Sequence, residues 1–517
     1  MDAPIARRAL ASALIAGVVA DALFDRTLLG INVPLATLAV LSVVTLLGHS
    51  PRPADRLDLW LPVLALLASL GPAIRTDPTV IGLDLLLVAA AVSAWSFAVS
   101  GVAVTRRTTA AVAMLGAEAA AAVGFGLVWL LGRADAASLL GRGARNFGRL
   151  APVARGLVIA VPIVFGFTLL LTSADAVFGR ALDTALRLPF DIDEAVRRGV
   201  FTFVATFLVA GPISIAVGGS AGWLRELELA PEAPGDVAAP GGEAAPPSGP
   251  VSGAQPARRS GVTEVMVVVI AVDILFALFA AVQIVFLFGG TDTLAVIGMS
   301  YSDYARQGYF QLVGVVTLAG MLLLGAHAVV GRIRAFLVVA IALLVLTAVI
   351  LASAALRLGL YQGAYGWTEL RFFVAASIGW LGLCVALALT MLATNRMRWL
   401  SHGLAMSAAA VTLAVSAIGP QAFVMHENVA RQLDPRLVAP GGHTGLDIDY
   451  GVTLGEDAIP DLVVALGFVP PAERQQLLML LRQRRDELDA AAVTSGPLSW
   501  NLARTRAREA LAGLPTS

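Results

Sequence analysis

The chain has 517 residues, of which 58% are hydrophobic and only 14% are charged. Soluble domains carry about 25% charged residues, so this composition excludes an ordinary soluble protein. The net charge is +0 at neutral pH, which argues against nucleic acid as a partner. The one cysteine, Cys384, can form no intrachain disulfide and supports no multi-cysteine metal site.

Apolar runs of membrane-spanning length recur from Ala9 to Gly419. At 1.5 Å rise per residue, about 20 residues cross a bilayer. We therefore predict an all-α fold, a polytopic transmembrane helical bundle of about 12 spans with a small, mostly helical C-terminal domain. The spans are expected at residues 9–24, 30–48, 57–75, 79–104, 109–132, 153–178, 197–219, 263–288, 309–330, 333–355, 367–393 and 399–419.

Composition divides the chain into four parts. Residues 1–223 form an N-terminal transmembrane bundle of seven expected spans, and residues 224–262 form a linker rich in Pro, Gly and Ala that we expect to be disordered. Residues 263–419 form a second bundle of five spans. Residues 420–517 have no further span but carry apolar residues at helical spacing, which predicts a helical soluble or membrane-surface tail.

Arginines in short loops predict the orientation, because positive residues favour the cytoplasmic side. The pairs flanking the last five spans place the C-terminal tail outside the cell. In the first half, Arg7, Arg52 and Arg107 put the N-terminus inside. Seven spans would then leave the linker outside, against the second half. Either one of the seven runs does not cross, or the Arg-rich segment 133–155 breaks the rule.

Charged residues inside spans are costly and need a reason, about 2.5–3.5 kcal/mol at a helix centre on insertion scales. Asp273 lies mid-span with Gln283 near the far end, and Asp84, Glu118 and His327 lie in other spans. They form either an ion, proton or substrate path, or buried hydrogen bonds between helices that fix their register. We expect Asp273 to face inward, within reach of Arg306, Arg371 or His327.

Three polar loops complete the candidate site in the membrane. Asp175, in LTSADAVFGR, either caps a helix or belongs to a site. Arg306, in SYSDYARQGYFQL, suits an interfacial helix and can pair with an acidic residue or a lipid phosphate. Glu369 and Arg371 are two residues apart, so on a helix they point differently and should pair with different elements.

Several segments resemble a known family. TEVMVVVIAVDILFALFAAVQIVFLFGG, YSDYARQGYFQL and YGWTELRFF are similar to the bacterial polytopic DUF4173 family, which is related to DUF4153. LTSADAVF follows the same pattern, with Ala176 where Pro is common. The tail segments LDIDYGVTLGEDAIPDL and SWNLARTRAREAL resemble the family's C-terminal motifs. The resemblance implies an integral membrane protein of bacteria and brings no activity, cofactor or catalytic residue.

Three classes of function remain open. The intramembrane carboxylates favour a transporter, and the tail residues Trp500, Asn501 and Arg504 favour a sensory or signalling protein whose tail binds a partner. The alternative is a polytopic enzyme acting on lipid-linked substrates, although no nucleophile–base pair or metal motif stands out. We predict transport or envelope signalling in the bacterial cytoplasmic membrane. The lipid bilayer is the expected partner, and no catalytic residue, metal or cofactor is predicted.

Overall fold

The structure is a computed structural model that describes residues 3–134, 194–218, 265–281 and 309–514, apart from a few positions within these ranges. Every regular element in the described part is helical, which confirms the predicted all-α class. The spans expected at 153–178 and the linker at 224–262 lie outside the described residues, as do Asp175, Gln283 and Arg306.

The chain divides into two compact units. Unit 1 comprises residues 1–231 and 484–508, and unit 2 comprises residues 232–483 and 509–517. The long tail helix α22 (Pro471–Thr494) begins in unit 2 and ends in unit 1. This grouping by contacts differs from our four-part division, which stays a prediction, because part of the tail packs within unit 1.

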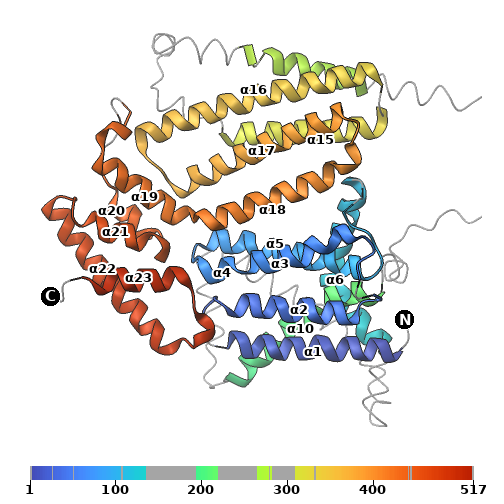
Figure 1. The fold of residues 1–517 in the computed structure, drawn as a ribbon, viewed down its shortest axis with the longest axis horizontal. Helices are drawn as coiled ribbons and strands as arrows, with labels where there is room; N and C mark the ends of the chain where they lie inside the picture. The colour runs from blue at the N-terminus through green and yellow to red at the C-terminus, as the bar shows by residue number, and fades with distance from the viewer. Residues whose placement is uncertain are drawn as a thin grey trace, which may run out of the picture. The chain divides into compact units, whose positions relative to one another are not determined.

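Unit 1 is a bundle in which most of the apolar helices run side by side (Figure 1). Its elements are α1 (Ala3–Phe24), α2 (Asn32–Leu47), η1 (Arg56–Leu59), α3 (Trp60–Ser69), α4 (Gly71–Ile74), α5 (Pro78–Val99), α6 (Thr109–Arg133), α10 (Glu194–Gly218), η6 (Pro497–Ser499) and α23 (Leu502–Ala512). Asp77 caps α5 by accepting hydrogen bonds from the backbone N–H groups of Thr79 and Val80.

Helix α10 packs closely on α1 and α6 because glycines line both contacts. A Cβ atom at Gly17 of α1 would lie 2.0 Å from Oγ1 of Thr206 on α10. On the other side, a Cβ at Gly211 of α10 would lie 2.9 Å from Cα of Val123 on α6. Small residues that let helix backbones approach are typical of helix packing in membranes.

Different contacts hold the helices together at the two ends of the unit 1 bundle. At the end that holds residues 27–32, which we call the Gly30 end, Arg198 at the start of α10 pairs with Asp21 at 2.8 Å. At the opposite end, which we call the N-terminal end, Nδ1 of His49 lies 3.2 Å from the carbonyl oxygen of Ala216 near the end of α10. Helix α10 therefore runs from the Gly30 end to the N-terminal end.

Helix α6 has both of its ends at the N-terminal end of unit 1. Near its start, Leu115 belongs to a buried cluster with Phe97 and Val102, where α5 finishes. Just beyond its last turn, the carbonyl oxygen of Ala134 accepts a hydrogen bond of 3.0 Å from Nε of Arg7. Helix α6 thus lies across this end of the bundle, which is a different path from the crossing expected for residues 109–132.

Unit 2 contains a second helical bundle followed by short helices. The bundle consists of the helix Val265–Leu278, α15 (Tyr309–Val330), α16 (Arg334–Tyr365), α17 (Glu369–Ala393), η3 (Met397–Trp399) and α18 (Leu400–Ile418). The short helices are α19 (Pro420–Leu433), η4 (Pro435–Leu437), α20 (Ile448–Thr453), η5 (Glu456–Ala458) and α21 (Ile459–Ala465). The buried core of the bundle includes Phe336, Leu343 and Ile350 of α16 and Val385 of α17.

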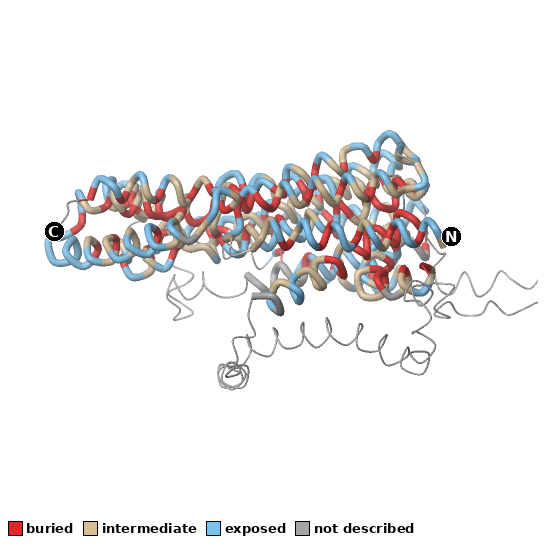
Figure 2. Tube along the Cα trace, turned by 90° about the horizontal axis from the view of Figure 1, so that it is seen from below, coloured by how far each residue is buried: buried red, intermediate tan, exposed pale blue. Residues whose placement is uncertain are grey.

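Among the described residues, 7 helices are long and apolar enough to cross a membrane. They span Ala3–Phe24, Arg56–Ile74, Pro78–Val99, Arg197–Gly218, Arg334–Tyr365, Glu369–Ala393 and Met397–Ile418. Many large apolar residues on these helices are exposed, and Figure 2 shows exposed stretches along the helices. Outward-facing apolar side chains suit a bilayer, so the chain is membrane-embedded. The expected count of about 12 spans is not confirmed.

Candidate functional site

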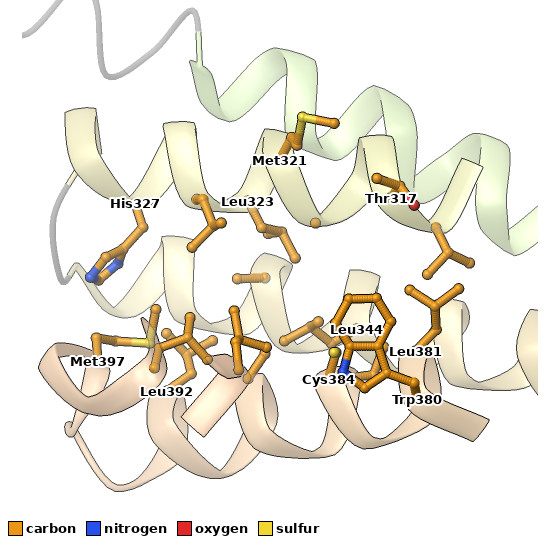
Figure 3. Close-up of a pocket in the computed structure, with 18 of the residues that line it drawn as sticks. Thr317, Met321, Leu323, His327, Leu344, Trp380, Leu381, Cys384, Leu392 and Met397 are labelled. Atoms are coloured by element: carbon orange, nitrogen blue, oxygen red, sulfur yellow. The ribbon is translucent and has the colours of Figure 1, made fainter. Parts of the chain in front are cut away.

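The unit 2 bundle contains a cavity of about 350 Å³ between α15, α16, α17 and α18. Figure 3 shows His327 and Met397 near one end of the cavity and Trp380 and Cys384 toward the other. The wall is almost wholly apolar. Its residues include Val316, Leu323, Phe336, Leu344, Leu381, Val385, Leu392, Leu400 and Leu404.

Two of the few polar side chains on the wall, Trp380 and His327, contact neighbouring side chains. The indole N–H of Trp380 donates to the hydroxyl of Ser407 at 3.2 Å, so the ring presents carbon to the cavity. Ser407 in turn donates to the carbonyl oxygen of Leu404. His327 stacks on Phe336 with 6.0 Å between ring centroids. Its Nδ1 is buried and has no hydrogen-bonding partner among the described residues.

An apolar wall of this kind favours an apolar ligand. Apolar cavities of this kind do not hold water well, because water needs two or more polar partners. Burying apolar surface is favourable by about 25 cal/mol per Å². Met321 on the wall is 58% exposed, so the cavity reaches the surface of the described helices. An acyl chain or a similar apolar group is the ligand that fits this site.

Asp273 lies on the helix Val265–Leu278 and does not line this cavity. Its side chain is half-buried, and its Oδ1 is buried with no hydrogen-bonding partner among the described residues. No hydrogen bond joins it to Arg371 or His327 within that part of the chain. Arg306, the third expected neighbour, is outside it. Whether Asp273 is functional stays a prediction.

The structure brings Glu369 and Arg371 to a polar junction where the turn between α16 and α17 meets the tail helices. The backbone N–H of Glu369 donates to the hydroxyl of Tyr450 at 2.9 Å. Its carboxylate accepts from the amide of Gln421 at 2.9 Å. Arg371 points elsewhere, donating to the carbonyl oxygens of Tyr365 and Gly366. Their spacing of two residues predicts this divergence.

Two further side chains hold this turn. Asn428 accepts a hydrogen bond from the N–H of Trp367 at 2.8 Å and donates to the same residue's carbonyl at 2.9 Å. Arg431 donates to the carbonyl oxygens of Gln362 and Gly363 at the end of α16. A cation at a helix C-terminus is stabilised by the helix dipole. Burial lowers the pKa of Arg431 from its ordinary value, and the charge of Arg371 adds to this effect.

Beside the junction lies a cleft of about 350 Å³ lined by Arg371, Asn428, Arg431, Asp447 and Tyr450. Burial raises the pKa of the Tyr450 phenol above its ordinary value. The phenol therefore stays protonated at neutral pH. The two arginines on the wall donate to backbone carbonyls, and a carboxylate lies on the same wall. We therefore interpret the side chains that line the cleft mainly as a connection between the tail helices and α17.

The tail candidates Trp500, Asn501 and Arg504 lie together in unit 1 at the Gly30 end. Asn501 is 2% exposed, and its amide donates to the carbonyl oxygens of Pro72 and Arg75, each at 2.9 Å. The carbonyl of Trp500 accepts from the N–H of Ile31 at 3.1 Å, and Arg504 donates to the carbonyl of Leu29. The side chain of Trp500 is 49% exposed. We call residues 499–504 the clasp.

The clasp joins the tail to two loops of the N-terminal bundle. Gly30 is required there, because a Cβ atom would lie 2.4 Å from the carbonyl oxygen of Trp500. The unusual sequence WNLxR therefore serves contacts within the chain. Its role toward a partner stays a prediction, carried by the exposed side chain of Trp500.

Sequence reasoning missed the cavity and several polar residues. Ser407, Gln421, Asn428 and Tyr450 form no recognised site motif in the sequence, although Gln421 and Asn428 are seven residues apart and Tyr450 lies in a segment that resembles the family. Asn428 could have been predicted, because it lies on the amphipathic segment after Pro420 and a side-chain amide can bond both the N–H and the carbonyl of a turn residue. The cavity has no sequence signal, since its wall consists of the same apolar residues as the lipid-facing surface.

A family model described as a domain of unknown function, DUF4153, matches residues 63–465. The chain therefore belongs to the DUF4153 family, and the coarser part of our predicted resemblance is confirmed. The match includes the cavity and the polar junction but ends before the clasp. Comparison with curated proteins and with solved structures gives no match.

Proposed function

We propose that the protein binds an apolar, lipid-like molecule among α15–α18 in the bacterial cytoplasmic membrane, in the service of transport or envelope signalling. The observation that carries the proposal is the cavity of about 350 Å³ with an almost wholly apolar wall. Ligand pockets of roughly 300–1,000 Å³ lined by apolar side chains are typical of small-molecule sites. The narrower resemblance to the DUF4173 family is part of this proposal.

An ion path and an enzyme active site receive less support from the described residues. An ion path would need carboxylates that converge on a cavity, and neither Asp273 nor any other acidic residue lines the one between α15 and α18. An enzyme would need a nucleophile and a base within hydrogen-bonding reach. Cys384 and His327 share the wall, but Figure 3 shows them toward different ends.

Our proposal includes an orientation, which is supported by the arginine rule together with the path of α6. If the N-terminal end of unit 1 faces the cytoplasm, Arg7, Arg52, Arg107 and Arg133 all lie on that side. Helix α10, which ends at Gly218, would then finish on the cytoplasmic side, as the cytoplasmic linker inferred from the arginines of the second half requires. The Gly30 end, with the clasp, is extracytoplasmic.

The experiment uses a glycine that lines the cavity. A Cβ atom at Gly320 would meet nothing within 4 Å, so Gly320→Leu adds a side chain to the cavity without a clash at Cβ. Gly325, on the same helix, is exposed and equally free of neighbours, and it does not line the cavity. Gly325→Leu is therefore the matched control.

Each full-length protein would be purified in mild detergent, and its bound apolar molecules would be identified by native mass spectrometry. We expect the wild type and Gly325→Leu to retain a bound lipid or other apolar molecule, and Gly320→Leu to lose most of it. Equal retention in all three proteins, or none in the wild type after reconstitution with membrane lipids, would contradict the proposal.

A further inference from the structure

The clasp adjoins a second cavity, of about 250 Å³, between the end of α22 and α23. Its wall differs from the wall of the apolar cavity in unit 2, because it carries hydroxyl, amide and guanidinium groups. The residues that line it are Ala492, Ser495, Gly496, Pro497, Ser499, Trp500, Asn501, Arg504, Thr505 and Arg508. No acidic side chain is among these residues.

Two arginines reach this cavity from one face of α23. Arg504 and Arg508 are four residues apart, so they lie one turn apart on the same side of the helix. Arg504 is held in place by hydrogen bonds to the carbonyl oxygens of Ser499 and Leu29. Glu509 follows Arg508 directly and therefore points away from this face.

Arg508 is the group whose chemistry is unsatisfied. Its Nε is buried and has no hydrogen-bonding partner among the described residues. A buried, unpaired donor on a charged group is costly, more so than a neutral one, so a compensating anion is expected beside it. The guanidinium fork matches the oxygens of a phosphate or carboxylate, and hydrogen bonds of this charged kind are the strong ones.

The surroundings favour a phosphate group. The cavity lies at the N-terminus of α23, where the helix dipole stabilises negative charge. Ser495 lines the same space, and a hydroxyl group is suited to phosphate oxygens, whereas the hydroxyl of Thr505 already donates to the carbonyl oxygen of Asn501. Trp500, 49% exposed, stands at the rim beside the loops at the Gly30 end, where the helices of the bundle finish. Tryptophan is enriched at the level of lipid headgroups.

From these contacts we infer that Arg508, with Arg504 and Ser495, binds a phosphate group in the cavity between α22 and α23. The group is carried either by an anionic lipid headgroup or by a free phosphate compound. This site is independent of the apolar cavity in unit 2, so either proposal can fail without the other.

The test compares three variants of the full-length protein. Arg508→Gln removes the charge, Arg508→Lys keeps it, and Arg506→Gln is the matched control, because Arg506 is exposed on the same helix and does not line the cavity. Thermal unfolding without ligand shows that each variant is folded.

Two probes distinguish the sources. Inorganic phosphate is titrated calorimetrically at constant ionic strength, and nanodiscs of phosphatidylglycerol or phosphatidylcholine are compared for lipid retained on the protein by native mass spectrometry. We expect Arg508→Gln to weaken binding by about 10- to 100-fold, Arg508→Lys to retain part of it, and Arg506→Gln to match the wild type.

Each outcome decides the inference. Binding of phosphate that depends on Arg508 supports the site and shows that a free phosphate suffices. Retention of phosphatidylglycerol alone, again dependent on Arg508, supports the site with a lipid as its source. No binding of either probe by the wild type, or equal losses in Arg508→Gln and Arg506→Gln, would overturn it.

Discussion

Asn501 donates a hydrogen bond of 2.9 Å to the carbonyl oxygen of Pro72, although 429 positions separate the two residues in the sequence. The same amide satisfies the carbonyl of Arg75. Both carbonyls lie at the end of the α3–α4 segment, where the last backbone carbonyls of a helix have no partner within the helix. One buried side chain thus closes the Gly30 end of unit 1 and fixes where the tail attaches.

Replacing Asn501 with aspartate should loosen this attachment. Asn501→Asp keeps the shape but removes both N–H donors and places a carboxylate against two carbonyl oxygens. We expect a loss of roughly 1–3 kcal/mol of stability, seen as a lower midpoint of thermal unfolding in detergent. Asn395→Asp is the control, since Asn395 is exposed in a turn with a positive φ that aspartate also tolerates. Equal midpoints for the two variants would show that the clasp adds no stability.

The orientation can be tested with single cysteines, because the chain has only one cysteine to remove. In a Cys384→Ala background, Val493→Cys and Leu28→Cys place thiols at exposed positions of the Gly30 end, and Arg52→Cys places one at the N-terminal end. A membrane-impermeant maleimide added to intact spheroplasts should label the first two and leave the third unlabelled. Labelling of Arg52→Cys together with Val493→Cys would contradict the placement of the two ends of unit 1 on opposite sides of the membrane.

Gly366 links the turn between α16 and α17 to the tail helices, and a side chain there should be harmful. Its φ is +74°, and a Cβ atom would lie 2.7 Å from Oδ1 of Asn428. Gly366→Ala combines backbone strain with this clash, so we expect a loss of roughly 1–3 kcal/mol, measured by thermal unfolding. Gly359→Ala, in the exposed helical part of α16 with open space around it, should instead gain roughly 0.5–1 kcal/mol. Similar effects of the two substitutions would show that the turn adapts.

The fold class was predictable because membrane helices appear in the sequence as long apolar runs. The expected spans contain or overlap α1, α5, α16, α17 and α18. The path of α6 was not predictable. Its apolar run has the length of a crossing, and only contacts of Arg7 with Ala134 and of Leu115 with Phe97 show that it turns across one end.

The candidate sites show the same division. Glu369, Arg371 and Asn501 stood out because polar residues at span ends and in motifs need partners, and the structure supplies those partners. The apolar cavity and Arg508 did not stand out. In the sequence, the leucines of the cavity wall cannot be distinguished from lipid-facing leucines. An arginine on an arginine-rich helix is likewise indistinguishable from one on a solvated face.

The most direct test of the proposed function is photo-crosslinking with a fatty acid that carries a photoreactive group on its acyl chain. The full-length protein in nanodiscs would be irradiated and digested, and the labelled residues mapped by mass spectrometry. We predict labels concentrated on cavity residues such as Leu344, Trp380 and Leu392, competed by unlabelled fatty acid and lost in Gly320→Leu. Labels spread evenly over outward-facing residues such as Leu318 and Val338, unchanged by Gly320→Leu, would contradict a lipid-binding cavity.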